Sequence, residues 1–262
     1  MIRALRQLSL AALFVAPSIA SGLACAENRE SIYIAAVLDK SGLGEGACTM
    51  TCTGGGITFR DHGYLDVRYA NHYPAALAVF NQLLERQSKA KAAAESSFVN
   101  LEGAEVRLTD AGNNEIVQPF SVPVASFVSA NAGTPSCSPA GVDLIDYHAA
   151  QVLAAQLQGT GVIKRVNAHV KVFGTSTGGT AVESAEFLYP IDVCWNCLLT
   201  FPAAAADLTA LPSYRCAISS DQGTVPDVPM PPCTPAGVDS PVDCRYCLLT
   251  TPESDWGLCQ PN

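Results

Sequence analysis

The chain has 262 residues, 11 cysteines and a formal net charge of −9, and removing the two arginines of residues 1–24 takes that charge from −9 to −11. An acidic chain with scattered Lys and Arg has no positive patch for nucleic acid, so nucleic acid is excluded as a partner. The length suits one large domain, or one domain with a smaller module.

Residues 1–24 predict a signal peptide, because two positive charges precede a short apolar run and a group of small residues. No later stretch reaches the roughly 18 apolar residues of a spanning helix, so we expect the rest of the chain to be exported completely. Two cleavage sites compete. One releases a soluble chain that begins at Glu27, whereas Leu23-Ala24-Cys25 looks like a bacterial lipobox, in which Cys25 becomes acylated. The lipid is favoured because Cys25 otherwise has no evident use.

Without Cys25, ten cysteines remain, an even number in an oxidising compartment, which predicts up to five disulfides. Three of the ten precede residue 194 and seven lie at or beyond it. Both groups are odd, so at least one bridge must join them if all ten are paired. The predicted disulfide cysteines are Cys48, Cys52, Cys137, Cys194, Cys197, Cys216, Cys233, Cys244, Cys247 and Cys259.

Residues 25–56 predict a linker, a first buried strand over Ile32–Leu38 and a cysteine-containing loop. The glycines at 42, 44 and 46 follow that strand as they would in a phosphate-binding turn. Such a turn needs a helix after it. The stretch from Cys48 to Cys52 follows instead, so a loop is the better interpretation.

Residues 57–193 alternate in the manner of half-buried strands. Leu65, Val67 and Tyr69 share one face, which predicts that Asp66 and Arg68 point to solvent. A second alternating stretch, Phe98–Leu108, changes phase at Gly103, which predicts a β-bulge there.

The clearest strand is Val162–Phe173, in which small apolar residues alternate with polar ones. The Gly174–Gly179 run then predicts a turn into a second strand that ends at Val193, and together they predict a β-hairpin. Two segments, Phe80–Ser97 and Leu144–Gln158, favour helix, the second with Asp143 as its N-cap. We therefore expect a mainly β fold, an antiparallel immunoglobulin-like β-sandwich with short connecting helices over residues 57–193.

Residues 194–262 hold seven cysteines and many prolines, which predicts an irregular, disulfide-rich C-terminal tail. Two short repeats occur, Cys194–Pro202 with Cys244–Pro252, and Cys137–Asp143 with Cys233–Asp239. Two copies are too few for a solenoid.

Three groups of residues carry a resemblance to a known family: Asn100–Leu108, Val170–Gly174, and Cys194-x-x-Cys197-Leu198 with Pro241–Cys247. With them the chain resembles a family of uncharacterised myxobacterial cysteine-rich envelope lipoproteins over nearly its whole mature length. The resemblance implies attachment to the envelope. It brings no activity, and so no functional residue is carried over.

One candidate catalytic residue is Ser176, because Gly174-Thr175-Ser176-Thr177-Gly178 matches the nucleophile elbow of serine hydrolases. That elbow needs a helix after the serine, and here a strand-type sequence follows. None of the four histidines, His62, His72, His148 and His169, is tied to Ser176 by order or spacing. A hairpin turn is the preferred interpretation, with exposed or locally bonded histidines.

The two C-x-x-C pairs are candidate metal or redox sites. Zinc ribbons separate their pairs by about 15–20 residues, whereas 46 residues intervene here. A redox role needs Cys194 at a helix N-terminus, and its surroundings show no helical pattern. Disulfides are preferred, with a metal-binding module as an alternative.

These patterns predict a non-catalytic structural or binding module of the cell envelope, with no cofactor and no metal. We expect an outer-membrane or cell-surface lipoprotein, or else a secreted or periplasmic soluble protein. A lipid anchor would be its only membrane attachment, and its partner a protein or glycan of the cell surface. The rival function is a secreted serine hydrolase that uses Ser176.

Overall fold

The computed structural model describes residues 30–39, 58–85, 97–205, 215–217 and 233–260, together with Cys48, Met50, Cys52 and Val228. We call residues 30–193 the body and residues 194–260 the tail. The predicted signal peptide, the lipidation residue Cys25 and the glycine loop at 42–46 lie outside the described residues.

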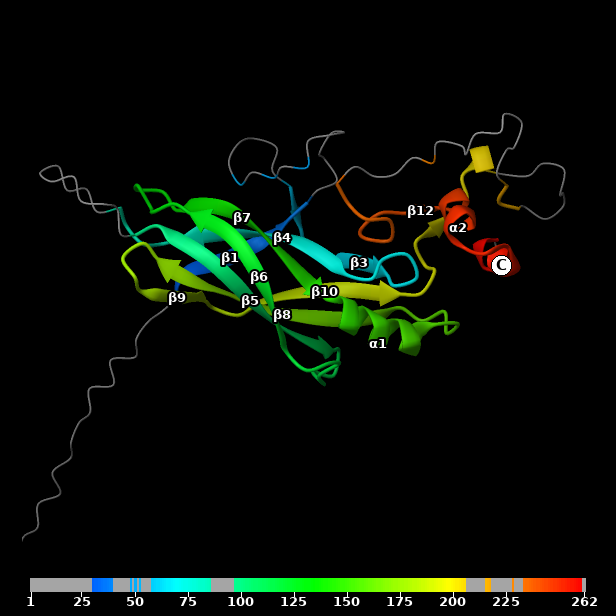
Figure 1. The fold of residues 1–262 in the computed structure, drawn as a ribbon, viewed down its shortest axis with the longest axis horizontal. Coiled ribbons are helices and arrows are strands. Elements are labelled where there is room, and N and C mark those ends of the chain that lie inside the picture. The colour runs from blue at the N-terminus through cyan, green and yellow to red at the C-terminus, as the bar shows by residue number, and fades with distance from the viewer. Residues whose placement is uncertain are drawn as a thin grey trace, which may run out of the picture.

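The body is built mainly from strands (Figure 1). Its strands are β1 (Glu30–Leu38), β2 (Phe59–Arg60), β3 (Gly63–Asp66), β4 (Tyr73–Asn81), β5 (Val99–Asp110), β6 (Phe120–Val128), β7 (Ser136–Ile145), β8 (Lys164–Ser176), β9 (Ala181–Ser184) and β10 (Phe187–Cys194). One helix, α1 (Tyr147–Leu157), lies between β7 and β8. The mainly β prediction is therefore confirmed.

All ten body strands belong to one hydrogen-bonded sheet. The pairing runs β6–β5–β8–β9–β1–β4–β7, with β10 beside β8 and β3 beside β10. Two of the pairs, β1–β9 and β3–β10, are parallel. The sheet is thus mixed rather than purely antiparallel, and its pairing does not confirm an immunoglobulin-like sandwich.

The sheet curls so that β6 and β7, at the two ends of this order, come together. Ser126 Oγ donates to the Pro139 carbonyl at 2.9 Å, and Ser138 Oγ donates to the Phe127 carbonyl at 2.7 Å. The inward faces of the strands enclose one continuous apolar core. Burial of those side chains is the main force that holds the curled sheet.

Strand β8 shows how the sequence dictates this core. Its alternating residues Val166, Ala168, Val170 and Val172 are all 0% exposed, as predicted. The bulge predicted at Gly103 is present, because the register of β5 against both β6 and β8 shifts between Leu101 and Gly103. A Cβ at Gly103 would clash with the ring of Phe173, so the glycine leaves room for that ring over the bulge.

The hairpin predicted around Gly174–Gly179 is also confirmed, since Phe173 pairs with Glu183 and Thr175 with Ala181. Helix α1 is shorter than the predicted Leu144–Gln158. Its N-cap is Asp146, whose carboxylate accepts from Ala149 N–H at 2.7 Å, and not Asp143, which lies in β7.

The helix predicted over Phe80–Ser97 is wrong in its described parts. Phe80 and Asn81 end β4, and Leu84 forms an isolated bridge to Asn131. The middle of the segment, residues 86–96, lies outside the described residues. The helix-favouring composition of this segment was overridden at its start by the pairing of β4 with β7.

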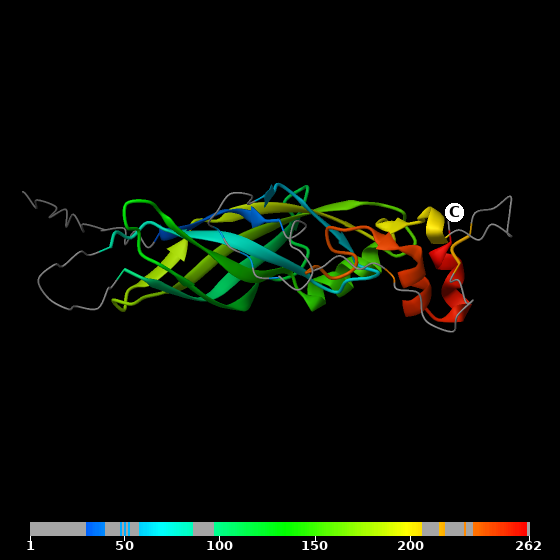
Figure 2. The same cartoon turned by 90° about the horizontal axis from the view of Figure 1, so that it is seen from above.

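The tail lies at the end of the body toward which β10 runs (Figures 1 and 2). It contains β11 (Leu199–Thr200) paired in parallel with β12 (Val242–Asp243), helix α2 (Cys244–Thr250), and the 3-10 turns η1 (Ala203–Ala205) and η3 (Glu253–Cys259). The tail is therefore less irregular than predicted. Among the described residues, no helix is both long enough and apolar enough to cross a membrane.

Candidate functional site at the junction of body and tail

The junction is organised around Asp66, the last residue of β3. The parallel pairing of β3 with β10 places Asp66 opposite Cys194. Asp66 is 0% exposed, which contradicts its predicted place on the solvent face. The alternation fails here because β3 ends at Asp66 and residues 67–69 form a turn.

The Asp66 carboxylate holds the loop that follows β10. Its Oδ1 accepts from the backbone N–H of Arg68 at 3.2 Å and of Asn196 at 2.8 Å, and its Oδ2 accepts from Leu198 N–H at 3.0 Å. Burial raises the pKa of Asp66 above its ordinary value, and these three hydrogen bonds oppose that effect.

A disulfide between Cys194 and Cys197 lies directly beside this carboxyl group. A carboxylate oxygen of Asp66 and the two sulfur atoms all lie within 4.8 Å of one another. The two cysteines differ in exposure, because Cys194 is 1% exposed whereas Cys197 is exposed. The bridge thus joins a buried residue to an exposed one, and a carboxylate oxygen of Asp66 lies within 4.8 Å of both sulfur atoms.

A second carboxyl group, that of Asp239, comes from the tail, and its side chain is 11% exposed. Its Oδ1 accepts from Tyr64 N–H, and its Oδ2 accepts from the Tyr73 hydroxyl, both at 2.8 Å. The guanidinium of Arg60 lies 3.6 Å from Oδ1. Burial raises the pKa of Asp239, and burial likewise raises the pKa of Tyr73 and of Tyr189.

The residues before Asp239 fix the tail to the body. Val238 is 1% exposed, belongs to the core of the body and forms a bridge to Leu65. The carbonyl of Gly237 accepts from Asp66 N–H at 2.8 Å. The Cys48–Cys233 disulfide adds a covalent link. It is the single bridge between body and tail, which confirms the prediction that an odd number of bridges joins them.

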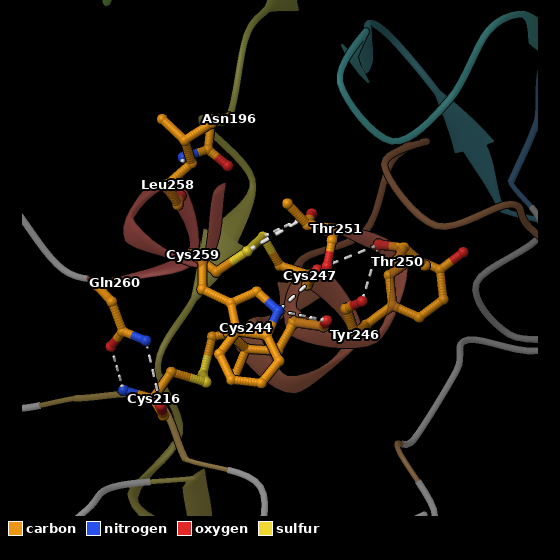
Figure 3. Close-up of a disulfide and its surroundings, with 12 residues drawn as sticks. Asn196, Cys216, Cys244, Tyr246, Cys247, Thr250, Thr251, Leu258, Cys259 and Gln260 are labelled. Carbon is orange, nitrogen blue, oxygen red and sulfur yellow. Dashed lines mark hydrogen bonds between the residues drawn. A yellow bond between two sulfur atoms is a disulfide. The ribbon is translucent and has the colours of Figure 1, made fainter. Parts of the chain in front are cut away.

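The remaining tail is held by two disulfides of its own. Cys216 is bridged to Cys244, and Cys247 to Cys259. Figure 3 shows Gln260 beside Cys216, where its side chain accepts from Cys216 N–H at 2.7 Å and donates to the Cys216 carbonyl at 3.2 Å. These four cysteines are buried, and they form a small core with Ala205 and Leu248.

The junction also has an outer rim of polar contacts. Arg68 and Asn196 both donate to the Leu258 carbonyl, at 3.0 and 3.1 Å. The Tyr69 hydroxyl donates to the Asn196 side chain at 2.7 Å. The C-x-x-C loop is therefore held from the body by Asp66 and Tyr69, and from the tail by η3.

Ser176 does not lie in this junction. The turn after it leads into β9, so the helix of a nucleophile elbow is missing at this position of the described chain. Its Oγ accepts from Thr180 N–H at 3.1 Å. The described residues that line the 240 Å³ hollow beside it are Ser31, Leu83, Ser97, Ser176, Gly178, Thr180 and Val182, with no histidine among them.

The four histidines lie apart from Ser176 and make local contacts. His62 bonds to Asp61 and Tyr64, His72 bonds to Asn71, and His148 is exposed on α1. His169 bonds to Glu186 at 2.8 Å and to Thr109 at 3.1 Å. His62 reaches the edge of the junction through Tyr64, whose N–H donates to Asp239, and none of these contacts involves Ser176.

The two C-x-x-C pairs do not form one metal site. Cys194 and Cys197 are bridged to each other, whereas Cys244 and Cys247 are bridged to different partners. With Cys52–Cys137, the structure has five bridges that use all ten predicted cysteines. A sulfur in a disulfide is no thiolate, so these pairs do not supply the ligands that zinc requires.

Sequence reasoning missed Asp66, Asp239 and Tyr73 as members of one site. The alternation of residues 65–69 predicted that Asp66 points to solvent, which is wrong. Asp239 lies in a segment whose apolar residues show no periodicity. The one available signal was the repeat, which places Asp239 six residues after Cys233 as Asp143 lies six after Cys137. Asp143, however, is exposed in β7, so the repeat alone would have misled.

The fold and the junction together define a class: a mainly β protein whose one large mixed sheet is joined by a disulfide to a small, disulfide-rich C-terminal tail. No protein-family model matches the chain, and no curated protein matches it either.

Proposed function

We propose that the chain is a non-catalytic structural or binding module of the cell envelope, related to the myxobacterial lipoproteins that its sequence resembles. The observation that carries this proposal is the set of five disulfides, including the Cys48–Cys233 link between body and tail. Such bridges persist in oxidising compartments and are rare in the cytosol. The lipid on Cys25 would attach the module to the membrane.

The rigid junction supports a binding role over catalysis. Every buried side-chain nitrogen and oxygen of the described residues has a hydrogen-bond partner, as expected where polar contacts hold a structure in place. A stapled surface of this kind suits a protein or glycan partner outside the cell, because little conformational entropy is lost on binding.

Fractionation and intact-mass measurement of the protein from its native envelope test the proposal. We expect a mature chain that starts at Cys25 with bound acyl groups, enters the detergent phase and carries five intact bridges. The Cys25→Ser variant should be soluble or unprocessed. A wild-type protein that starts at Glu27 in the soluble fraction would disprove the anchor, and one with reduced cysteines in the cytoplasm would disprove the compartment.

An active-site serine probe tests the non-catalytic part. Labelling at Ser176, abolished in the Ser176→Ala variant, would favour the hydrolase instead. We expect no labelling of either protein, because the turn after Ser176 leads into a strand and the lining of its hollow contains no histidine.

A further inference from the structure

The five disulfides are not equivalent in loop length or exposure. Cys194–Cys197 joins residues only 3 apart, whereas the others join residues 12, 28, 85 and 185 apart. A bridge that closes so short a loop restricts the unfolded chain least. The entropy of the unfolded chain therefore explains this bridge less well than it explains the other four.

The two ends of this bridge have different surroundings. Cys197 is exposed, so an incoming thiolate can reach its sulfur. Cys194 is 1% exposed, and a carboxylate oxygen of Asp66 lies within 4.8 Å of its sulfur as well as of the Cys197 sulfur. In the second C-x-x-C pair, by contrast, Cys244 and Cys247 are both 0% exposed. Cys48 of the Cys48–Cys233 bridge is also exposed, but no carboxylate oxygen of the described residues lies within 4.8 Å of both sulfurs of that bridge.

We propose that the Cys194–Cys197 bridge is a covalent attachment site for a thiol, at which an incoming thiolate attacks the exposed sulfur of Cys197. A bond forms between the incoming sulfur and Cys197, the bond between Cys197 and Cys194 breaks, and its electron pair leaves on the Cys194 sulfur. Asp66 gives a proton to that sulfur and regains one from water. The incoming thiol is oxidised to a mixed disulfide while Cys194 is reduced to a thiol, so no further oxidant is needed.

Three features of the junction suit this chemistry. Asp66 holds Asn196 and Leu198 by their backbone N–H groups, which keeps the loop in place when the bridge opens. Burial raises the pKa of Asp66, so its carboxyl group keeps a proton to a higher pH than an ordinary aspartate. The tail remains attached in the opened state, because Cys48–Cys233 and the contacts of Val238 are separate from this bridge.

The thiol site rests on the proposed function in one respect, namely that the protein binds a partner. The shared chemistry of the ligand is a thiol, carried by a small molecule or by a protein. Purified mature protein is incubated with reduced glutathione or with a cysteine-containing peptide, then quenched in acid and mapped by peptide mass. We expect a mixed disulfide at Cys197, a free thiol at Cys194 and four intact bridges.

Mixed disulfides at Cys197 with either thiol support the site, and the faster of the two shows which source it prefers. First opening at another bridge, or attachment at Cys194, would overturn the proposal. So would a bridge that opens only when the whole protein unfolds. None of these results depends on where the protein resides, so this test and the fractionation test fail independently.

Single-cysteine variants provide a matched control for the direction of attack. In Cys194→Ser the lone thiol of Cys197 is exposed, whereas in Cys197→Ser the lone thiol of Cys194 is buried. We expect a disulfide probe to label Cys194→Ser at least about tenfold faster, because thiol reactivity follows exposure. Equal rates would refute the assignment of Cys197 as the attacked sulfur.

Asp66→Asn separates proton transfer from a merely structural role. Asparagine keeps an oxygen acceptor but carries no acidic proton, so attachment to the intact bridge should slow by at least about tenfold. In the Cys194→Ser background there is no leaving sulfur to protonate, so Asp66→Asn should slow labelling of Cys197 far less than it slows attachment to the intact bridge, and the remaining change measures the loop that Asp66 holds. If both rates change equally, or neither changes, Asp66 does not supply the proton.

Discussion

The Cys48–Cys233 bridge should stabilise the protein far more than the Cys194–Cys197 bridge. The perturbation is the pair of double variants Cys48→Ser/Cys233→Ser and Cys194→Ser/Cys197→Ser. The first removes a link between residues 185 apart, and the second a link between residues 3 apart. The two variants lose the same number of sulfur atoms, so each serves as the control for the other.

The expected magnitudes follow from the loop that each bridge closes in the unfolded chain. Cys52–Cys137 shortens the path between Cys48 and Cys233, which leaves a loop of roughly 100 residues and a stabilisation of about 4.7 kcal/mol. The loop of Cys194–Cys197 has about four residues, for which the same relation gives about 2 kcal/mol. The free energies of unfolding of the two variants should therefore differ by about 3 kcal/mol.

Urea denaturation without reductant measures this difference. With a slope of about 2 kcal/mol per molar urea, the midpoint of the Cys48→Ser/Cys233→Ser variant should fall about 1.5 M below that of the other. Equal midpoints would refute the reasoning. They would mean that the contacts of Val238 and Asp239 restrict the tail fully without the covalent link.

The remaining predictions concern the core and pH. Val170 is 0% exposed, so Val170→Asp should lower the free energy of unfolding by about 4 kcal/mol. Lys171→Gln, on the exposed face, should change it by less than about 0.5 kcal/mol. Equal urea midpoints for the two variants would show that the faces of β8 are misassigned. Burial raises the folded-state pKa of Asp239, so its favourable contribution is greatest below about pH 4 and is lost as the pH rises through that raised value. Asp239→Asn lacks this titration, and its stability relative to wild type should improve between pH 4 and 7; parallel curves of midpoint against pH would contradict the burial argument.

The sequence was sufficient to predict those elements in which the alternation of apolar and polar residues extends over the whole segment. The alternation of β8 and the hairpin after it follow from the sequence, because a strand with one buried face needs an apolar residue at every second position. The bulge at Gly103 was visible for the same reason, as a change of phase in that pattern. These elements place most of the core.

Local pattern was insufficient where partners distant in sequence decide the structure. The parallel pairs β1–β9 and β3–β10 join strands that are far apart in the chain. The sequence of a single strand does not predict the direction of the strand that pairs with it. The same limit applies to the cysteines. Their parity requires a bridge between body and tail, but only the folded chain shows that Cys48 and Cys233 form it.

The repeat shows that local similarity does not fix structure either. Cys194–Pro202 and Cys244–Pro252 share the pattern C-x-x-C-L-L-T-x-P, yet the first copy forms the end of β10, a bend and β11, while the second forms α2. The first copy follows β10 and is held by Asp66, whereas Asp243 caps the second by accepting from Arg245 N–H at 2.9 Å. The contacts with Asp66 and Asp243, rather than the shared sequence pattern, decide the conformations of the two copies.

The two acids of the junction, the buried Asp66 and the mostly buried Asp239, differ in what their contacts explain. Asp239 is matched by a backbone N–H, a tyrosine hydroxyl and the guanidinium of Arg60, so a structural role accounts for it. Asp66 also accepts backbone hydrogen bonds, but it alone lies beside a disulfide with one exposed sulfur. Burial of an acid is costly, and chains keep such groups where structure or chemistry needs them. If thiol attachment is the reason for Asp66, Asp239→Asn should leave attachment at Cys197 unchanged while Asp66→Asn slows it, and equal slowing by both variants would reduce Asp66 to a second structural acid.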